Sequence, residues 1–200
     1  MAGVLGNRGK CAGACRLPYE LVVNSNKEIC MDKGYILSPK DLCGLSYIPD
    51  LIAIGVSSLK IEGRMKTPEY VATVTRIYRK YIDLAYSNKK FVIGEQDKKD
   101  LLQVFNRGGF STGHLDSEPN KNLIFKEKPS NVGVYIGNVA NYNKTKGHIT
   151  LNLNDNLTIS DTIVFEKEDT KYRISELMMG KNNIDYAVNR SACNYWKNER

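Results

Sequence analysis

The sequence predicts an α/β region followed by an all-β region: the last β/α units of a TIM-barrel-like domain, and then a small antiparallel β-barrel. Up to about residue 90, helical patterns alternate with short apolar runs bounded by glycine, which is the rhythm of a parallel β/α architecture. From residue 131, apolar residues recur at every second position in short segments separated by polar turns, which is typical of antiparallel strands. An apolar fraction of 42% supports a packed core.

The β/α region contains clear helix signals. Ser38, Pro39 and Asp41 occupy the N-cap, first and third positions of one predicted helix. A second short helix is expected over residues 49–54, ended by Gly55 in a left-handed conformation.

The next part of the chain reads as one further β/α unit. Residues 56–61 (VSSLKI) are expected to form a strand, and Thr67 and Pro68 begin a helix that keeps a three-four apolar spacing to about residue 86. A parallel sheet needs several strands with both faces covered, so one or two such units do not make a domain alone. We therefore interpret residues 1–90 as the C-terminal part of a larger β/α domain, truncated at its N-terminus.

Two further regions complete the predicted organisation. Residues 91–130 hold a short helix at about 96–105, a glycine-rich turn and a polar linker. Residues 131–200 are expected to form a small β-barrel domain, whose last stretch, 189–200, shows no strand pattern.

The net charge of +7 is concentrated in the first half of the chain. Residues 1–90 carry 14 Lys or Arg against 8 Asp or Glu, whereas residues 91–200 carry 15 against 14. A basic half suits an anionic partner such as RNA or a phosphorylated substrate, and the alternative is a solvated basic surface. No apolar run is long enough to cross a membrane and no signal peptide is recognisable, so we expect no membrane association, a cytoplasmic location and reduced thiols.

Four of the five cysteines lie in the first quarter of the chain: Cys11, Cys15, Cys30 and Cys43. Four thiolates are enough for zinc or an iron–sulfur cluster, although the C-x3-C spacing differs from that of a zinc knuckle. Nearby Arg8, Lys10 and Arg16 favour thiolates and would partly offset a cluster's negative charge. The alternative, which we favour for Cys30 and Cys193, is that a free cysteine serves as a small apolar core residue.

Lys60, Glu62 and Arg64 are the candidate catalytic residues. They follow the predicted strand at 56–61, and parallel β/α domains place their chemistry at the carboxyl ends of strands. Alternate residues share one face, so the carboxylate would lie between two cations, where it stays ionised and can orient a substrate or act as a base. The alternative is a structural ion pair that closes the end of the barrel.

A turn formed by Asn106, Arg107 and two glycines is a candidate substrate-binding element, because its backbone N–H groups could hold an anion. It could equally be a connector. The sequence contains no His-Glu-x-x-His motif and only two histidines.

Four ordered segments closely resemble the collagenase-like protease family, peptidase family U32: GNRGKCAGACRLPYEL, YILSPKDLCGL, GVSSLKIEGRMKTPEYVATVTRIYRKYID and VFNRGGFSTGHL. The resemblance implies an N-terminal β/α-barrel-like domain whose signature segment, with two cysteines and a serine, precedes the position of Cys11. This sequence does not contain that segment, so residues 1–90 would be the C-terminal part of that β/α-barrel-like catalytic domain. The glycine–aspartate strand that usually closes the family's small barrel is not recognisable either, and we expect the chain to be a fragment with an incomplete barrel domain. In members that hold an iron–sulfur cluster, two ligands come from that segment, and the other two match Cys11 and Cys43, with Cys15 a further candidate.

The resemblance implies two activities. Members are named proteases, while better-defined relatives hydroxylate RNA bases. Our main hypothesis is that the intact parent is an iron–sulfur enzyme for base hydroxylation in tRNA or rRNA. In it, Lys60, Glu62 and Arg64 would orient substrate or transfer protons, and the substrate-binding residues would be Arg8, Arg16, Asn106 and Arg107. The alternatives are a protease that cleaves peptide substrates with Glu62 and a metal or cysteine, and a non-catalytic module that binds RNA or a partner. We expect the chain alone to be inactive, and zinc remains the alternative metal.

Overall fold

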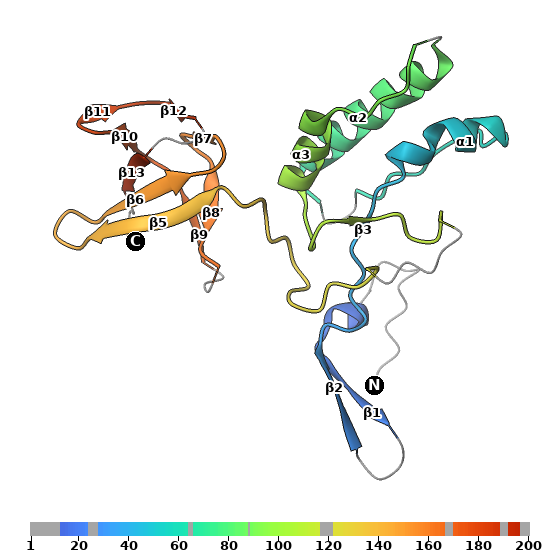
Figure 1. Ribbon diagram of the computed structural model, residues 1–200, viewed down its shortest axis with the longest axis horizontal. Coiled ribbons are helices and arrows are strands. Elements are labelled where there is room, and N and C mark those ends of the chain that lie inside the picture. Colours follow the sequence, from blue (N-terminus) through green and yellow to red (C-terminus); the bar gives the residue numbers. More distant parts are fainter. Residues whose placement is uncertain are drawn as a thin grey trace. The chain divides into compact units, whose positions relative to one another are not determined.

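The computed structural model describes residues 13–23, 28–63, 66–87, 89–116, 122–166, 170–188 and 192–196. The chain divides into two compact units, Met1–Val134 and Tyr135–Arg200, each taken by itself below. The first unit holds the helices and the second holds antiparallel strands (Figure 1).

The first unit begins with a short 3-10 turn, η2 (Ala14–Arg16), and a hairpin that the sequence patterns did not indicate. Its strands, β1 (Tyr19–Val23) and β2 (Glu28–Gly34), pair antiparallel. The hydroxyl of Tyr19 donates to the carbonyl of Ala14 at 2.8 Å, which fixes the turn against the start of β1.

Residues 38–42 are extended, so the helix predicted from Ser38 is wrong. The carbonyl of Ser38 accepts from Phe125 N at 3.0 Å, and Lys40 N donates to the Leu123 carbonyl at 2.8 Å. These bonds to a distant segment satisfy the backbone groups that a helix would have used. The chain then enters β3 (Asp41–Leu42), which pairs in parallel with β4 (Phe110–Ser111).

The three predicted helices that follow are confirmed. They are α1 (Ile48–Ala53), which follows the 3-10 turn η3 (Leu45–Tyr47), α2 (Pro68–Tyr86) and α3 (Glu95–Val104). Gly55 ends the first of them with a φ of 84°, and the Thr67 hydroxyl caps α2 by accepting from Tyr70 N at 3.3 Å. No helix in the described part of the chain is both long enough and apolar enough to span a bilayer.

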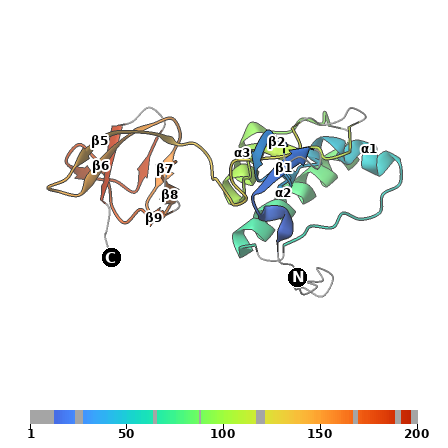
Figure 2. The same cartoon turned by 90° about the horizontal axis from the view of Figure 1, so that it is seen from below.

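The core of the first unit forms where α1 and α3 pack along α2 (Figures 1 and 2). Tyr81 is fully buried there, and its hydroxyl donates to the Asp97 carboxylate at 2.6 Å and accepts from Gly94 N at 2.7 Å. These two bonds join α2 to the beginning of α3. The buried apolar residues are Leu45, Ile48, Val74, Ile77, Tyr81 and Leu101.

Residues 56–61 do not form the predicted strand. Positions 56–60 are exposed, and no strand among the described residues pairs with this segment. A strand exists only through its ladder partner, so an apolar run without such a partner does not join a sheet. Among the described residues the parallel pairing is limited to β3 and β4, and TIM-barrel units are not confirmed.

The second unit confirms the predicted antiparallel strands. Its largest sheet has the order β11-β10-β13-β6-β5, and two further pairs are β7 with β12 and β8 with β9. This five-stranded sheet is open, with β5 and β11 at its edges, so the described strands do not form the closed barrel that the sequence predicted. The bounds are β5 (Gly137–Asn143), β6 (His148–Leu153), β7 (Leu157–Thr158), β8 (Thr162–Val164), β9 (Lys171–Arg173), β10 (Leu177–Met179), β11 (Asn182–Asn183), β12 (Tyr186–Ala187) and β13 (Ala192–Trp196).

The expectation of no strand in residues 189–200 is wrong, because β13 lies in the middle of the sheet. It pairs antiparallel with β6 from Ala192↔Asn152 to Trp196↔His148, and with β10 on its other side. Pairing with strands on both sides determines that this segment is a strand, whereas its own sequence shows little alternation of apolar and polar residues. The apolar side chains buried in this unit are Ile149, Leu151, Leu153, Leu157, Ile163, Ile174, Leu177 and Ala187.

Candidate functional site

Six side chains of the first unit interact around one carboxylate. We call them the basic–aromatic cluster. They come from η2, β3, the segment before α2, α2 itself and the turn after α3. The cluster consists of Arg16, Asp41, Lys66, Tyr70, Phe105 and Arg107.

Asp41 and Arg107 form the centre of the cluster. Arg107 Nε donates to Asp41 Oδ2 at 3.0 Å and Nη2 donates to Oδ1 at 2.5 Å, which makes a bidentate ion pair. The exposed fractions of the two side chains are only 14% and 18%. The parallel pairing of β3 with β4 places Asp41 opposite Phe110, three residues after Arg107, so the local topology builds this pair.

Arg16 joins the cluster from η2. Its Nη1 donates to Ser38 Oγ at 2.5 Å and to the Pro39 carbonyl at 3.1 Å. Burial, reinforced by the nearby Arg107 cation, lowers the pKa of Arg16 from its ordinary value. These hydrogen bonds attach η2 to the extended segment that leads into β3.

Lys66 lies over aromatic rings. Its ammonium is above the ring of Phe105 and 5.0 Å from the centroid of Tyr70, and those two rings meet edge to face at 6.1 Å. Burial lowers the pKa of Lys66 to about 8, with Arg107 and Arg16 adding to the effect and Asp41 opposing it. The guanidinium of Arg107 is also 5.2 Å from the Phe105 ring centroid.

The cluster therefore combines three cations, one carboxylate and two rings. An excess of positive charge in a half-buried place favours an anion, and rings among cations are typical of surfaces that bind nucleic-acid strands. The exposed carboxylate of Glu62 acts electrostatically on Tyr70 and so belongs to the rim of the cluster.

The structure brings together two of the predicted substrate-binding residues, Arg16 and Arg107. Asn106 stabilises the turn that carries Arg107. Its amide oxygen accepts from Gly109 N at 2.6 Å, and its amide nitrogen donates to the Gly133 carbonyl at 2.5 Å. Of the predicted catalytic residues, Lys60 and Glu62 are exposed on the segment before α2.

Three predicted site residues, Arg8, Cys11 and Arg64, lie outside the described residues. Four members of the cluster were not predicted as site residues from the sequence: Asp41, Lys66, Tyr70 and Phe105. For Lys66, the available signal was its position, because it continues the charged residues found at every second position at Lys60, Glu62 and Arg64. No local pattern joins Asp41 to Arg107, which is 66 residues away.

Cys43 lies directly after β3, and its N–H donates to the Ser111 carbonyl at 2.9 Å. Burial raises the pKa of its thiol, while hydrogen bonds from the Leu45 N–H and the Tyr78 hydroxyl oppose that rise. Hydrogen-bond donors directed at a sulfur suit a cluster ligand, because they stabilise the thiolate. Cys15, by contrast, is exposed on η2.

The described residues do not complete a metal site. No group of three His, Cys, Asp or Glu side chains that could hold a metal ion occurs within the described part of the chain. Cys43 fits the role of one ligand, and an iron–sulfur cluster or zinc would need further ligands.

The two thiols are expected to differ in reactivity. With iodoacetamide at neutral pH, Cys15 should be alkylated well before Cys43, because Cys43 is half-buried and its raised pKa reduces the thiolate that attacks the reagent. Peptide mass spectrometry over time measures both rates. The rate at Cys43 should rise as the pH is increased, and equal rates at neutral pH would contradict this arrangement.

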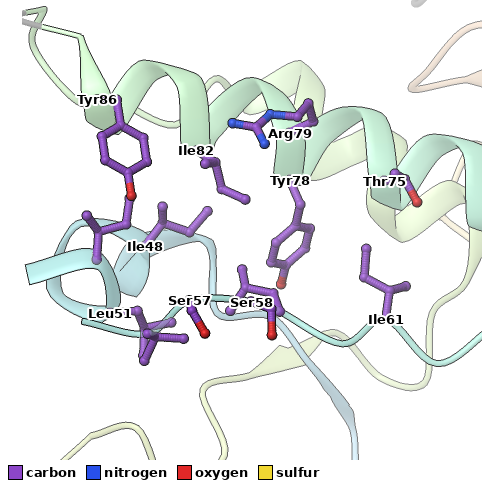
Figure 3. Close-up of a pocket in the computed structure, with 13 residues that line it drawn as sticks. Ile48, Leu51, Ser57, Ser58, Ile61, Thr75, Tyr78, Arg79, Ile82 and Tyr86 are labelled. Carbon is purple, nitrogen blue, oxygen red and sulfur yellow. The ribbon is translucent and has the colours of Figure 1, made fainter. Parts of the chain in front are cut away.

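A cavity of about 410 Å³ lies between α1, the extended residues 56–61 and α2 (Figure 3). Its walls are mainly apolar, with Ile48 and Leu51 from α1 and Ile82 and Tyr86 from α2. Tyr78 projects into the same cavity, and its hydroxyl accepts from Gly44 N at 3.0 Å. Tyr78 therefore contacts both the cavity and the residue that follows Cys43.

Comparisons with curated proteins give relatives with two kinds of name. The chain is 37% identical over 166 residues to "Uncharacterized protease MJ0090" of Methanocaldococcus jannaschii, covering 79% of this chain and 40% of that protein. It is 33% identical over 167 residues to "tRNA hydroxylation protein P1" of Bacillus subtilis, covering 80% and 39%. It is 45% identical over 105 residues to "Collagenase" of Porphyromonas gingivalis, covering 51% and 28%. The chain therefore spans about two fifths of the length of the first two of these relatives and less of the third.

Among solved structures, the C-terminal domain of a Geobacillus thermoleovorans U32 peptidase aligns with 34% of this chain and 87% of its own, at 20% identity and a TM-score of 0.29. The model of the family described as "Peptidase family U32" matches residues 1–124, which is more than half of the sequence. This match confirms the resemblance carried by the four segments, and the chain belongs to peptidase family U32.

Proposed function

We propose that this protein takes part in the hydroxylation of RNA bases and that the basic–aromatic cluster contacts the RNA. The observation that carries the proposal is the arrangement of Arg16, Lys66 and Arg107 around the single carboxylate of Asp41, beside two aromatic rings. The likeness to the tRNA hydroxylation protein of Bacillus subtilis supports it.

The chemistry of RNA explains why this arrangement suits it. Each phosphate carries one negative charge, and cations that neutralise phosphates supply most of the affinity for a nucleic acid. Unpaired bases stack on aromatic side chains, whereas the binding of a peptide does not require exposed aromatic rings. Cations and rings close together therefore favour RNA over a peptide.

We further propose Cys11 and Cys43 as ligands of an iron–sulfur cluster, with Cys15 nearby in the sequence and zinc as the alternative metal. A bound cluster would supply electron transfer to the reaction. The protein's own residues would bind and orient the RNA: Arg8, Arg16 and Arg107 by attracting its phosphates with their positive charge, and Lys60, Glu62 and Arg64 at the reacting base. Asn106 would keep the turn that carries Arg107 in place.

Deleting the gene in the organism that encodes this chain tests the proposal. We expect hydroxylated nucleosides, measured by mass spectrometry of digested tRNA and rRNA, to disappear and to return with the wild-type gene. A Cys43→Ser gene should fail to restore them, whereas Cys30→Ser serves as the matched control and should succeed.

Two results together would overturn the proposal. They are unchanged hydroxylated nucleosides in the deletion strain and clearing of gelatin by the wild-type protein that Glu62→Gln abolishes. That pair of results would support the peptidase reading instead.

A further inference from the structure

We propose that Lys66 is the member of the basic–aromatic cluster that directly pairs with an RNA phosphate, and that Tyr70 and Phe105 hold its ammonium ready for that contact. The inference rests on the proposed function and assigns the contact to one residue. It follows from how differently the three cations of the cluster are occupied.

The two arginines are already committed within the protein. Arg107 uses two donors on Asp41, and both side chains of that pair are largely buried. Arg16 uses one nitrogen on Ser38 and Pro39, which fastens η2 to the chain. Both guanidinium groups therefore add to the local potential while their geometry is fixed by structural contacts.

Lys66 is differently placed. Its side chain is half-buried, and within the described part of the chain no carboxylate lies at ion-pair distance from its ammonium. Within the described residues, its ammonium contacts the faces of the two rings. An ammonium over an aromatic ring is held less strongly than one that makes a charge-assisted hydrogen bond to an anion.

The surroundings of Lys66 favour an incoming anion. Burial and the positive charges of Arg16 and Arg107 disfavour its charged form, and Asp41 offsets them only in part, which is why the pKa falls to about 8. All three cations would attract a phosphate, whose negative charge would add to that of Asp41 in offsetting them. The ring contacts meanwhile limit the positions that the flexible lysine side chain can adopt, which reduces the entropy lost on binding.

Filter binding of an unmodified tRNA transcript over a salt series tests the assignment. We expect Lys66→Gln to weaken binding and to reduce the slope of log K against log salt by about 0.7–0.9, the contribution of one phosphate. Lys66→Arg should retain the slope, because it keeps the charge. Lys90→Gln, which removes an exposed lysine of the same unit, is the matched control and should bind like the wild type.

The pH dependence gives a second readout. Lys66 loses its proton as the pH rises through about 8, so wild-type affinity should fall at and above that pH while Lys66→Arg stays flat. The charged or titratable groups that act on Lys66 are Asp41, Arg107 and Arg16, with Tyr70 against its ammonium and Glu62 beyond that ring.

A footprint separates a phosphate contact from a purely structural role. Bound tRNA should protect Lys66 of the wild-type protein from acylation, measured by peptide mass spectrometry, and should leave Lys90 reactive. Wild-type binding with an unchanged slope in Lys66→Gln and no protection of Lys66 would overturn this inference and leave the RNA function standing. Absence of any salt-dependent binding by the wild type would instead overturn the proposed function.

Discussion

Replacing Asp41 with alanine is expected to lower the free energy of unfolding of the first unit by about 3 kcal/mol, since removing one partner of a buried ion pair leaves the other charge uncompensated. Here the orphaned group is Arg107, which would then face Arg16 and Lys66 with no carboxylate among them. Urea unfolding followed by circular dichroism measures the change, because the helices are in this unit.

Two further variants make this prediction specific. Asp41→Ala combined with Arg107→Ala should cost less than the sum of the single changes, because the double variant leaves neither charge behind. Asp83→Ala is the matched control: its pair with Arg79 lies on the exposed face of α2, so stability should hardly change. Equal losses for Asp41→Ala and Asp83→Ala would mean that the central pair contributes no more than a surface contact.

Replacing Gly137 with alanine is expected to destabilise the second unit by about 3 kcal/mol, because backbone strain and a steric clash add together. Gly137 opens β5 with a φ of 149°, and an added Cβ would lie 2.1 Å from the carbonyl oxygen of Asn152 on β6. That oxygen belongs to the backbone of the paired strand, so relief requires the two strands to move apart.

Backbone hydrogen exchange of the paired strands β5 and β6, followed over a urea series by mass spectrometry, measures the change. Protection should be lost at an earlier urea midpoint in Gly137→Ala. Gly180→Ala is the control: Gly180 also has a positive φ, of 65°, but its added Cβ meets nothing within 4 Å. Its cost should be nearer about 1 kcal/mol, the strain alone. Equal midpoints for the two variants would show that β5 and β6 absorb the clash.

The sequence predicted the elements whose signals are local. Thr67 and Pro68 predicted the start of α2, and Gly55 predicted the end of α1. Helix caps and left-handed glycines depend only on residues a few positions away. The strand β3 was missed because its partner β4 is about seventy positions away, and Pro39 reads like the start of a helix until Ile124 is seen beside it. The same limit explains why β13 was not predicted, and why 56–61 was expected to be a strand.

Only part of the candidate site was predicted, because some of its residues carry a local signal and others do not. Arg16 and Arg107 were identified because a basic stretch and a glycine-rich turn suggest anion binding by themselves. Asp41 carries no such signal: in the sequence it suits a helix N-terminus, and only the fold shows that it neutralises Arg107. The role of Lys66 could not be predicted without its contact with Phe105, and that residue follows α2 in the sequence.

The central place of β13 affects how the protein is made. During translation, β6 and β10 leave the ribosome before residues 192–196, so the backbone edge with which each strand pairs to β13 stays unpaired until those residues emerge. Exposed edges pair readily with strands of other chains, which makes the nascent protein prone to aggregation during that interval. A stop codon introduced shortly before residue 192 would make that interval permanent, and we expect the truncated polypeptide to accumulate as inclusion bodies.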